Sequence, residues 1–362
     1  MANIIDYIDW RGDLSFECAP FNDVDALILA QLSYLPFDGI LTDDVTMTVR
    51  EISEHFVPEK IPEKLRIISF RDDCTLLKKM GSSERFGKLP ISGFTHSLSA
   101  EREEQFAALT CELPDGKRYI SFRGTDDTIA GWKEDFNFSY LSETPSQARA
   151  VKYVNSLEDD DSELILGGHS KGGNLAVYAA VFCEERKHDR IRRIYDFDGP
   201  GFRSETADSE DYRRTIPLIT SIIPESSLVG QLLTANVQHS IVKSNASGLM
   251  QHLVYSWQVK RDRPDLTDEL STAGSIINKT VSTWLGGLDD ETRRMTVKAI
   301  FALLEAPDAE TFTELGKGKL KTYAAILNGI RKLAPEQQKV LMHAFKKLAA
   351  SGWDALLSQL NN

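Results

Sequence analysis

The most constraining feature of this chain is a glycine-rich turn between an apolar run and a run of small residues. The segment reads Leu-Ile-Leu-Gly-Gly-His-Ser-Lys-Gly-Gly-Asn-Leu-Ala over residues 164–176. The apolar run predicts a buried strand, and the small residues after the turn predict a helix. Gly168 and Gly172 flank Ser170, and their lack of side chains permits a tight turn. The sequence therefore predicts a strand–turn–helix unit with Ser170 at the tip of the turn.

A serine placed in this way is typical of a nucleophile. The pattern G-x-S-x-G between a strand and a helix marks the turn that carries the nucleophile in α/β-hydrolases. The first N–H groups of a helix have no acceptor inside it, so the N–H of Lys171 is available to an oxyanion. We expect Ser170 to be the nucleophile and the backbone N–H of Lys171 to be one oxyanion donor. The alternative is a structural turn in a fold that has lost its chemistry.

Strands and helices alternate along most of the chain, which predicts a largely parallel sheet covered by helices. We therefore expect an α/β-hydrolase fold. The expected helices are residues 22–35, 144–158 and 172–186, and the expected strands are the 104–123 hairpin, 163–167, 193–197, 216–223 and 240–243.

The pattern changes near residue 262, after which only helical periodicity is present. Residues 261–265 read Arg-Asp-Arg-Pro-Asp, a polar joint. Three apolar stripes with i, i+3, i+4, i+7 spacing follow it: Val297/Ile300/Phe301/Leu304, Tyr323/Ile326/Leu327/Ile330 and Leu341/Ala344/Phe345/Leu348. We expect an α/β-hydrolase domain over residues 1–264 and an all-helical C-terminal appendage over residues 265–362. The stripes are interpreted as packing surfaces, with a partner-binding groove as the alternative.

Composition limits the partners. A net charge of −12 argues against binding to nucleic acid or to anionic membranes. The four cysteines are scattered without metal-ligand spacing, so we expect free thiols, no metal and no cofactor. No apolar run approaches the roughly 20 residues of a transmembrane helix, and the N-terminus does not resemble a signal peptide. These features predict a cytoplasmic protein without a transmembrane segment.

A serine nucleophile needs a histidine base, which in this fold follows the serine and the acid along the chain. Of the seven histidines, chain order and surroundings leave His239 and His252. His252 follows a strand and a loop, which is where this fold places its base. His239 immediately precedes a strand, at its wrong end. We expect His252 to be the base.

The acid that orients the histidine has two candidates, and we expect it to be Asp198. Asp198 lies just past the strand 193–197, and catalytic groups gather at the carboxyl ends of parallel strands. Glu225 follows the next strand and is the alternative acid. Asp196 lies inside its strand and should point elsewhere.

A second oxyanion donor is expected upstream of the turn. Thr125 closes the sequence Phe-Arg-Gly-Thr at the end of the predicted hairpin, where its N–H and hydroxyl can face a developing oxyanion. The amphipathic residues 126–136 follow it, and they are compatible with either a lid over the site or a fixed helix.

These motifs together resemble the fungal-type, class three lipases, which carry F-R-G-[ST], W-x-x-D and G-H-S-x-G-G. The equivalents here are residues 122–125, Trp132 with Asp135, and residues 168–173, followed by the segment from His252 to Trp257. A closer resemblance is to the Mbeg1-like or DUF2974 group of bacterial lipase-like proteins. Its features are similar to the helix at residues 22–34, G-H-S-K-G-G-N-L-A, F-D-G-P-G-F and S-x-V-G.

Two departures from the lipase pattern bear on the site. Ser227 stands where the lipases have their acid, whereas the D-G-P-G-F context of Asp198 is similar to that of the acid in pancreatic-type lipases. Lys171 follows the nucleophile where the lipases have leucine or a small residue. Its cation would favour an anionic substrate or be solvated.

The residues and the resemblance predict a serine hydrolase that cleaves a carboxylic ester through an acyl-enzyme on Ser170. The expected partner is a small ester or lipid substrate. The alternative is a catalytically impaired protein of the same fold that acts as a binding or scaffold module through its helical tail.

Overall fold

The computed structural model describes residues 1–305 except 43, 44, 100 and 126–128, together with ten separate positions between 335 and 351. The predicted apolar stripes at Tyr323/Ile326/Leu327/Ile330 and Leu341/Ala344/Phe345/Leu348, and the first three residues of the possible lid, lie outside the described residues.

The described strands form a large mixed sheet with the order β1-β2-β3-β4-β5-β6-β7-β8-β11. Strands β4 to β8 run parallel, and the strands added at both edges pair antiparallel. The strands are β1 (Met47–Thr48), β2 (Pro90–Ser99), β3 (Glu104–Glu112), β4 (Arg118–Phe122), β5 (Leu164–His169), β6 (Ile191–Phe197), β7 (Ile219–Pro224), β8 (His239–Val242) and β11 (Leu266–Thr267). A separate pair is formed by β9 (Val259–Lys260) and β10 (Arg263–Pro264).

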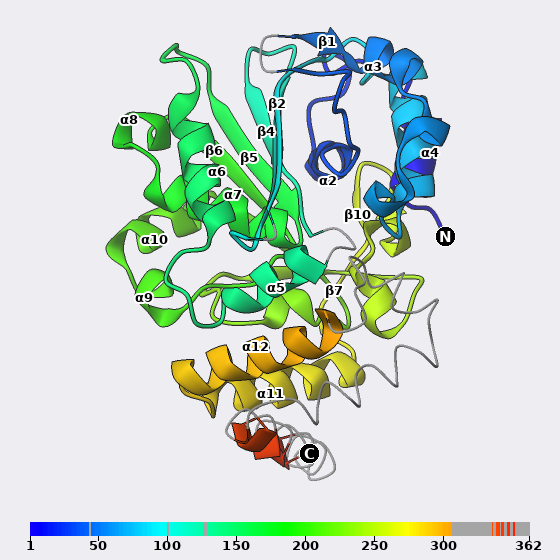
Figure 1. The fold of residues 1–362 in the computed structure, drawn as a ribbon. Coiled ribbons are helices and arrows are strands. Elements are labelled where there is room, and N and C mark those ends of the chain that lie inside the picture. Colours follow the sequence, from blue (N-terminus) through cyan, green and yellow to red (C-terminus); the bar gives the residue numbers. More distant parts are fainter. Residues whose placement is uncertain are drawn as a thin grey trace.

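Helices cover both faces of the sheet (Figure 1). Because β4 to β8 follow one another in chain order and crossovers share one hand, the helices that connect them lie on one face. These are α6 (Pro145–Ser156), α7 (Lys171–Phe182), α8 (Glu185–His188), α9 (Ser204–Ala207) and α10 (Glu210–Thr215). The other face packs against N-terminal helices, namely α1 (Ile4–Arg11), α2 (Asp23–Leu32), α3 (Val49–His55) and α4 (Phe70–Ser82). This arrangement is an α/β-hydrolase fold, as the sequence predicts.

Local sequence signals set several of these elements. Asn22 and Thr144 form capping boxes at the starts of α2 and α6, which satisfy N–H groups that the helix leaves unpaired. Several boundaries differ from expectation. The helix expected over residues 22–35 ends at Leu32. The helix expected to reach residue 186 ends at Phe182, and residues 216–218 form a 3₁₀ turn because Pro217 interrupts the expected strand.

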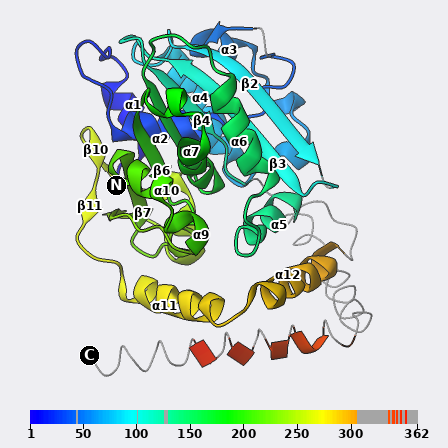
Figure 2. The same ribbon diagram turned by 90° about the vertical axis from the view of Figure 1, so that its left-hand side faces the viewer.

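Three further helices lie near the carboxyl ends of the parallel strands. Helix α5 (Ile129–Asn137) covers the region left open as lid or fixed helix, and α11 (Thr272–Gly286) and α12 (Asp290–Glu305) follow the last strand. Figure 2 shows α11 and α12 one after the other across the end of the molecule where α5 lies. Helix α12 packs on α5, with the rings of Phe136 and Phe301 5.7 Å apart. None of the described helices has the length and apolarity to cross a bilayer.

Candidate active site

Ser170 occupies a strained turn between β5 and α7. Its φ is 58° and its ψ is −131°, a conformation that non-glycine residues rarely adopt. A Cβ at Gly168 would overlap the backbone of Gly172, and a Cβ at Gly172 would overlap the carbonyl of Phe122. The N–H of Ser170 donates to the carbonyl of Phe197 at 2.8 Å. The turn therefore has the strand–turn–helix form that the sequence predicts, and its glycines are required by close backbone approach.

The structure brings His252 together with Asp198. His252 ends a 3₁₀ turn, η5 (Gly248–His252), and its Nδ1 lies 2.6 Å from Oδ2 of Asp198. Asp198 directly follows β6, has a φ of 54° and is fully buried. The alternative acid, Glu225, instead accepts a long 3.4 Å hydrogen bond from the N–H of Ser244.

The second carboxylate oxygen of Asp198 is held by the segment at which the lipases carry their acid. Ser227 donates its hydroxyl to Oδ1 of Asp198, and the N–H of Gly230 donates to the same oxygen at 3.1 Å. The Ser227 hydroxyl also accepts from the Gly230 N–H at 3.0 Å. Ser227 thus serves as a donor to the carboxylate, which leaves Oδ2 directed at the histidine.

Asp196 points away from His252 and stabilises the turn that carries Asp198. Its Oδ1 accepts from the N–H of Gly199 at 3.0 Å, and its Oδ2 accepts from Ser221 at 3.0 Å. Burial raises the pKa of Asp196 to about 7. His239 bonds to the same Ser221 hydroxyl at 2.9 Å, so it takes part in this polar row across the sheet.

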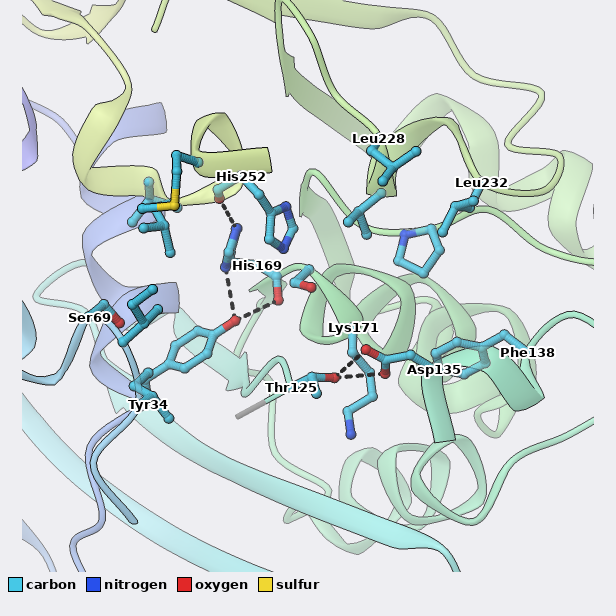
Figure 3. A pocket seen from close by; sticks show the side chains of 18 of the residues that line it. Tyr34, Ser69, Thr125, Asp135, Phe138, His169, Lys171, Leu228, Leu232 and His252 are labelled. Atoms are coloured by element: carbon cyan, nitrogen blue, oxygen red, sulfur yellow. Dashed lines mark hydrogen bonds between the residues drawn. The ribbon is translucent and has the colours of Figure 1, made fainter. Parts of the chain in front are cut away.

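His169, inside the turn, contacts His252 in a way the sequence does not reveal. The two rings lie 4.5 Å apart, and Nε2 of His169 is 2.8 Å from the His252 carbonyl. A carbonyl only accepts, which assigns the proton to Nε2 and leaves Nδ1 to accept from the Tyr34 hydroxyl at 2.9 Å. Burial lowers the pKa of His169 well below its usual value, which keeps the ring neutral. Tyr34 and His169 therefore hold the backbone of the His252 turn (Figure 3).

Thr125 is held by the next element of the lipase-like pattern. Its hydroxyl donates to both carboxylate oxygens of Asp135, at 2.7 and 2.6 Å, and burial raises the pKa of Asp135 to about 7. Because this proton is directed at Asp135, the backbone N–H is the group that Thr125 can offer to an oxyanion. Helix α5 supplies Asp135, so the part of α5 that carries Asp135 helps to fix the geometry of the site.

The side chain of Lys171 is neither solvated nor available to an anionic substrate, contrary to expectation. It is fully buried and forms a 3.1 Å ion pair with Glu134 of α5. Its Nζ also donates to the carbonyl and the side-chain oxygen of Gln105. The sequence contains no local sign of this pairing, because the partners are 37 and 66 positions away.

Ser170, His252 and Thr125 line one pocket of about 510 Å³. Figure 3 shows Thr125 and His252 among the side chains that line it. Most of its remaining surface is apolar, with contributions from Phe138, Leu228, Val229, Leu232, Met250 and Trp284. Trp284 belongs to α11, so this helix takes part in forming the pocket. Among the described residues, no cluster of three or more histidine, cysteine or acidic side chains is arranged to hold a metal ion.

Comparison with solved structures gives distant matches. The crystal structure of M37 lipase aligns with 57% of this chain and 68% of its own chain, at 15% identity and a TM-score of 0.36. Rhizomucor miehei lipase, solved as a propeptide complex, aligns with 44% of this chain and 57% of its own, at 16% identity and a TM-score of 0.33. No curated protein matches the chain.

A family model described as Mbeg1-like matches residues 80–302. The match runs from the end of α4 through the sheet, the Ser170 turn and the His252 turn into α12. It covers more than half of the 362 residues, and it agrees with the resemblance that the sequence motifs carry. The chain belongs to the Mbeg1-like family.

Proposed function

We propose that the protein is a serine hydrolase that cleaves a carboxylic ester. The observation that carries the proposal is the 2.6 Å contact between His252 and the buried Asp198, with His252 lining the same pocket as Ser170. An imidazole that is oriented by a buried carboxylate and shares a pocket with a serine on a strained turn is the arrangement that can activate a hydroxyl. The Nδ1–H group of His252 donates to the Asp198 carboxylate, so the other ring nitrogen, Nε2, is free to act as the base.

The reaction proceeds in two stages. Ser170 Oγ attacks the ester carbonyl carbon while His252 Nε2 takes the hydroxyl proton, and the N–H groups of Lys171 and Thr125 bind the oxyanion. The tetrahedral intermediate collapses, and the alcohol leaves with the proton from His252. Water then attacks the acyl-enzyme with His252 again as base, which releases the acid and restores the Ser170 hydroxyl.

The apolar lining of the pocket supports an apolar acyl group as the part of the substrate that is bound. Leu228, Leu232 and Met250 offer no charge to a ligand. Burying an alkyl chain against such side chains stabilises the complex by about 0.8 kcal/mol per methylene. We therefore expect kcat/KM for p-nitrophenyl esters to rise from acetate to medium-chain acyl groups. A steady fall with chain length would contradict an acyl-binding role of the pocket.

The proposal is tested with a fluorophosphonate probe, which phosphonylates an activated serine. We expect stoichiometric labelling of the wild type, none of Ser170→Ala, and full labelling of Ser156→Ala as a control at an exposed serine of α6. Hydrolysis of p-nitrophenyl esters should follow the same pattern. A folded wild-type sample that neither labels nor hydrolyses esters would contradict the proposal and favour a binding role for the fold.

A further inference from the structure

The Lys171 side chain is an unusual neighbour for a nucleophile because it is charged and completely enclosed. Its Nζ donates to the Gln105 carbonyl at 2.7 Å, to Gln105 Oε1 at 2.8 Å and to Glu134 Oε2 at 3.1 Å. An ammonium group has three donors, and all three are used. A buried ion pair of this kind contributes little net stability compared with apolar residues, because both charges lose their hydration. The ion pair is therefore better explained by the positions of the backbone segments that it connects than by stability.

Glu134 is fastened to two further elements. Its carboxylate accepts from the N–H of Gln105 at 3.0 Å, and from the N–H and hydroxyl of Ser146 at 2.9 and 2.8 Å. Gln105 belongs to β3, and Ser146 lies in the first turn of α6. The ion pair thus ties the start of α7 to α5, β3 and α6 through directional hydrogen bonds.

The same network reaches the peptide that carries the other proposed oxyanion donor. Gln105 Nε2 donates to the Gly124 carbonyl at 3.5 Å, and that carbonyl shares its peptide with the N–H of Thr125. On α5, Asp135 follows Glu134 and holds the Thr125 hydroxyl. Gln105 and α5 therefore contact both the Lys171 side and the Thr125 side of the site.

We propose that three side chains set the spacing of the two oxyanion N–H groups and are therefore positioning residues: those of Lys171, Glu134 and Gln105. The inference rests on the proposed function and deepens it. Oxyanion donors act at 2.7–3.1 Å from the charged oxygen, and misplacement by about 1 Å costs about 100-fold in rate. The Lys171 side chain joins one donor peptide covalently to this buried network. Hydrogen bonds from Gln105 and to Asp135 hold the other donor peptide, and together these links oppose such a displacement.

The test removes the ammonium group and retains the donor, because the donor is a backbone N–H. For Lys171→Met we expect kcat for p-nitrophenyl esters to fall about 10- to 100-fold with KM changed less than about twofold. The affinity for a trifluoromethyl ketone, whose adduct with Ser170 bears an oxyanion, should fall by the same factor as kcat/KM. The matched control is Lys187→Met at α8, since Lys187 is also a fully buried lysine. It should lower the melting temperature and leave kcat unchanged.

A second variant separates positioning from stability. Lys171→Met leaves Glu134 as an unpaired buried carboxylate, and Lys171→Met/Glu134→Gln removes that charge. We expect the double variant to regain melting temperature without regaining kcat or ketone affinity. Recovery of kcat together with stability would overturn the inference. If the wild type is labelled and active but Lys171→Met keeps the wild-type kcat and ketone affinity, only this inference fails. If the wild type is neither labelled nor active, the proposed function is overturned, and this inference fails with it.

Discussion

Oδ2 of Asp198 lies 2.6 Å from Nδ1 of His252, although the two residues are 54 positions apart in the chain. The carboxylate is fully buried, and its other oxygen is occupied by Ser227 and Gly230. One oxygen is thus fixed by the protein and the other is directed at the imidazole. Because Oδ1 is held in place by hydrogen bonds, the carboxylate keeps a fixed position while Oδ2 orients the imidazole of His252.

Asp198→Asn should abolish most of the proposed activity. An amide at this position can present an N–H to Nδ1 and stabilise the wrong tautomer, which costs about 10⁴-fold in kcat in a serine triad. Steady-state hydrolysis of a p-nitrophenyl ester measures the effect. Glu225→Gln is the matched control and should stay within about twofold of the wild type. An equal loss in both variants would contradict the assignment of Asp198.

Gly230→Ala should impair the site through Asp198. The added Cβ would lie 2.5 Å from Asp198 Oδ1, which is closer than a non-bonded carbon can approach an oxygen, so the carboxylate or the Gly230 backbone must shift. We expect kcat to fall about 10-fold or more, measured with the same ester. Gly116→Ala, in the exposed turn between β3 and β4, has open space around the added carbon and should leave kcat unchanged.

Tyr34→Phe should loosen the His252 turn. The substitution removes the hydroxyl that contacts His169 Nδ1 and leaves a buried ring nitrogen without its donor, at a cost of about 1–3 kcal/mol in the free energy of unfolding. Because His169 holds the His252 carbonyl, kcat should fall as well. Urea denaturation and ester hydrolysis measure the two effects. Tyr178→Phe, which removes a half-buried hydroxyl bonded to Glu143, should change stability only.

Asp73 should make stability depend on pH in an unusual direction. It accepts hydrogen bonds from Gln31, Ser69 and Tyr255, yet burial raises its pKa to about 7. Between about pH 4 and 7 the folded carboxyl keeps a proton that the unfolded one has lost, so this group's contribution to stability falls as pH rises through that window. This group lowers the free energy of unfolding by at most about 4 kcal/mol across the window, since one pKa unit corresponds to about 1.4 kcal/mol.

Asp73→Asn removes this titration and leaves an amide that can bond to the same three partners. We expect the melting temperature of the variant to exceed that of the wild type at pH 8, with the difference shrinking toward pH 4. Asp72→Asn makes the same charge change at an exposed neighbour, and its melting temperature should still fall with rising pH because Asp73 is retained. Parallel wild-type and Asp73→Asn curves would contradict the buried titration.

The sequence by itself determined the elements and the order of the proposed catalytic residues. The turn at Ser170 is local, since its glycines and the flanking apolar runs adjoin it. Chain order and local surroundings then favoured His252 over the other histidines. It favoured Asp198 as the acid and left Glu225 as the alternative, because both follow parallel strands and both suit an acid. Only the folded chain shows which carboxylate reaches the imidazole.

The tertiary structure alone decided what surrounds these residues. The sequence suggests that the Lys171 side chain is solvated or faces an anionic substrate, yet the side chain is buried against Glu134 and Gln105. His169 is hydrogen-bonded to Tyr34, which lies 135 positions away in the chain. Local patterns report periodicity and turn chemistry over a few residues. Hydrogen bonds between distant segments depend on how sheet and helices pack, so the support of the site is a property of the fold.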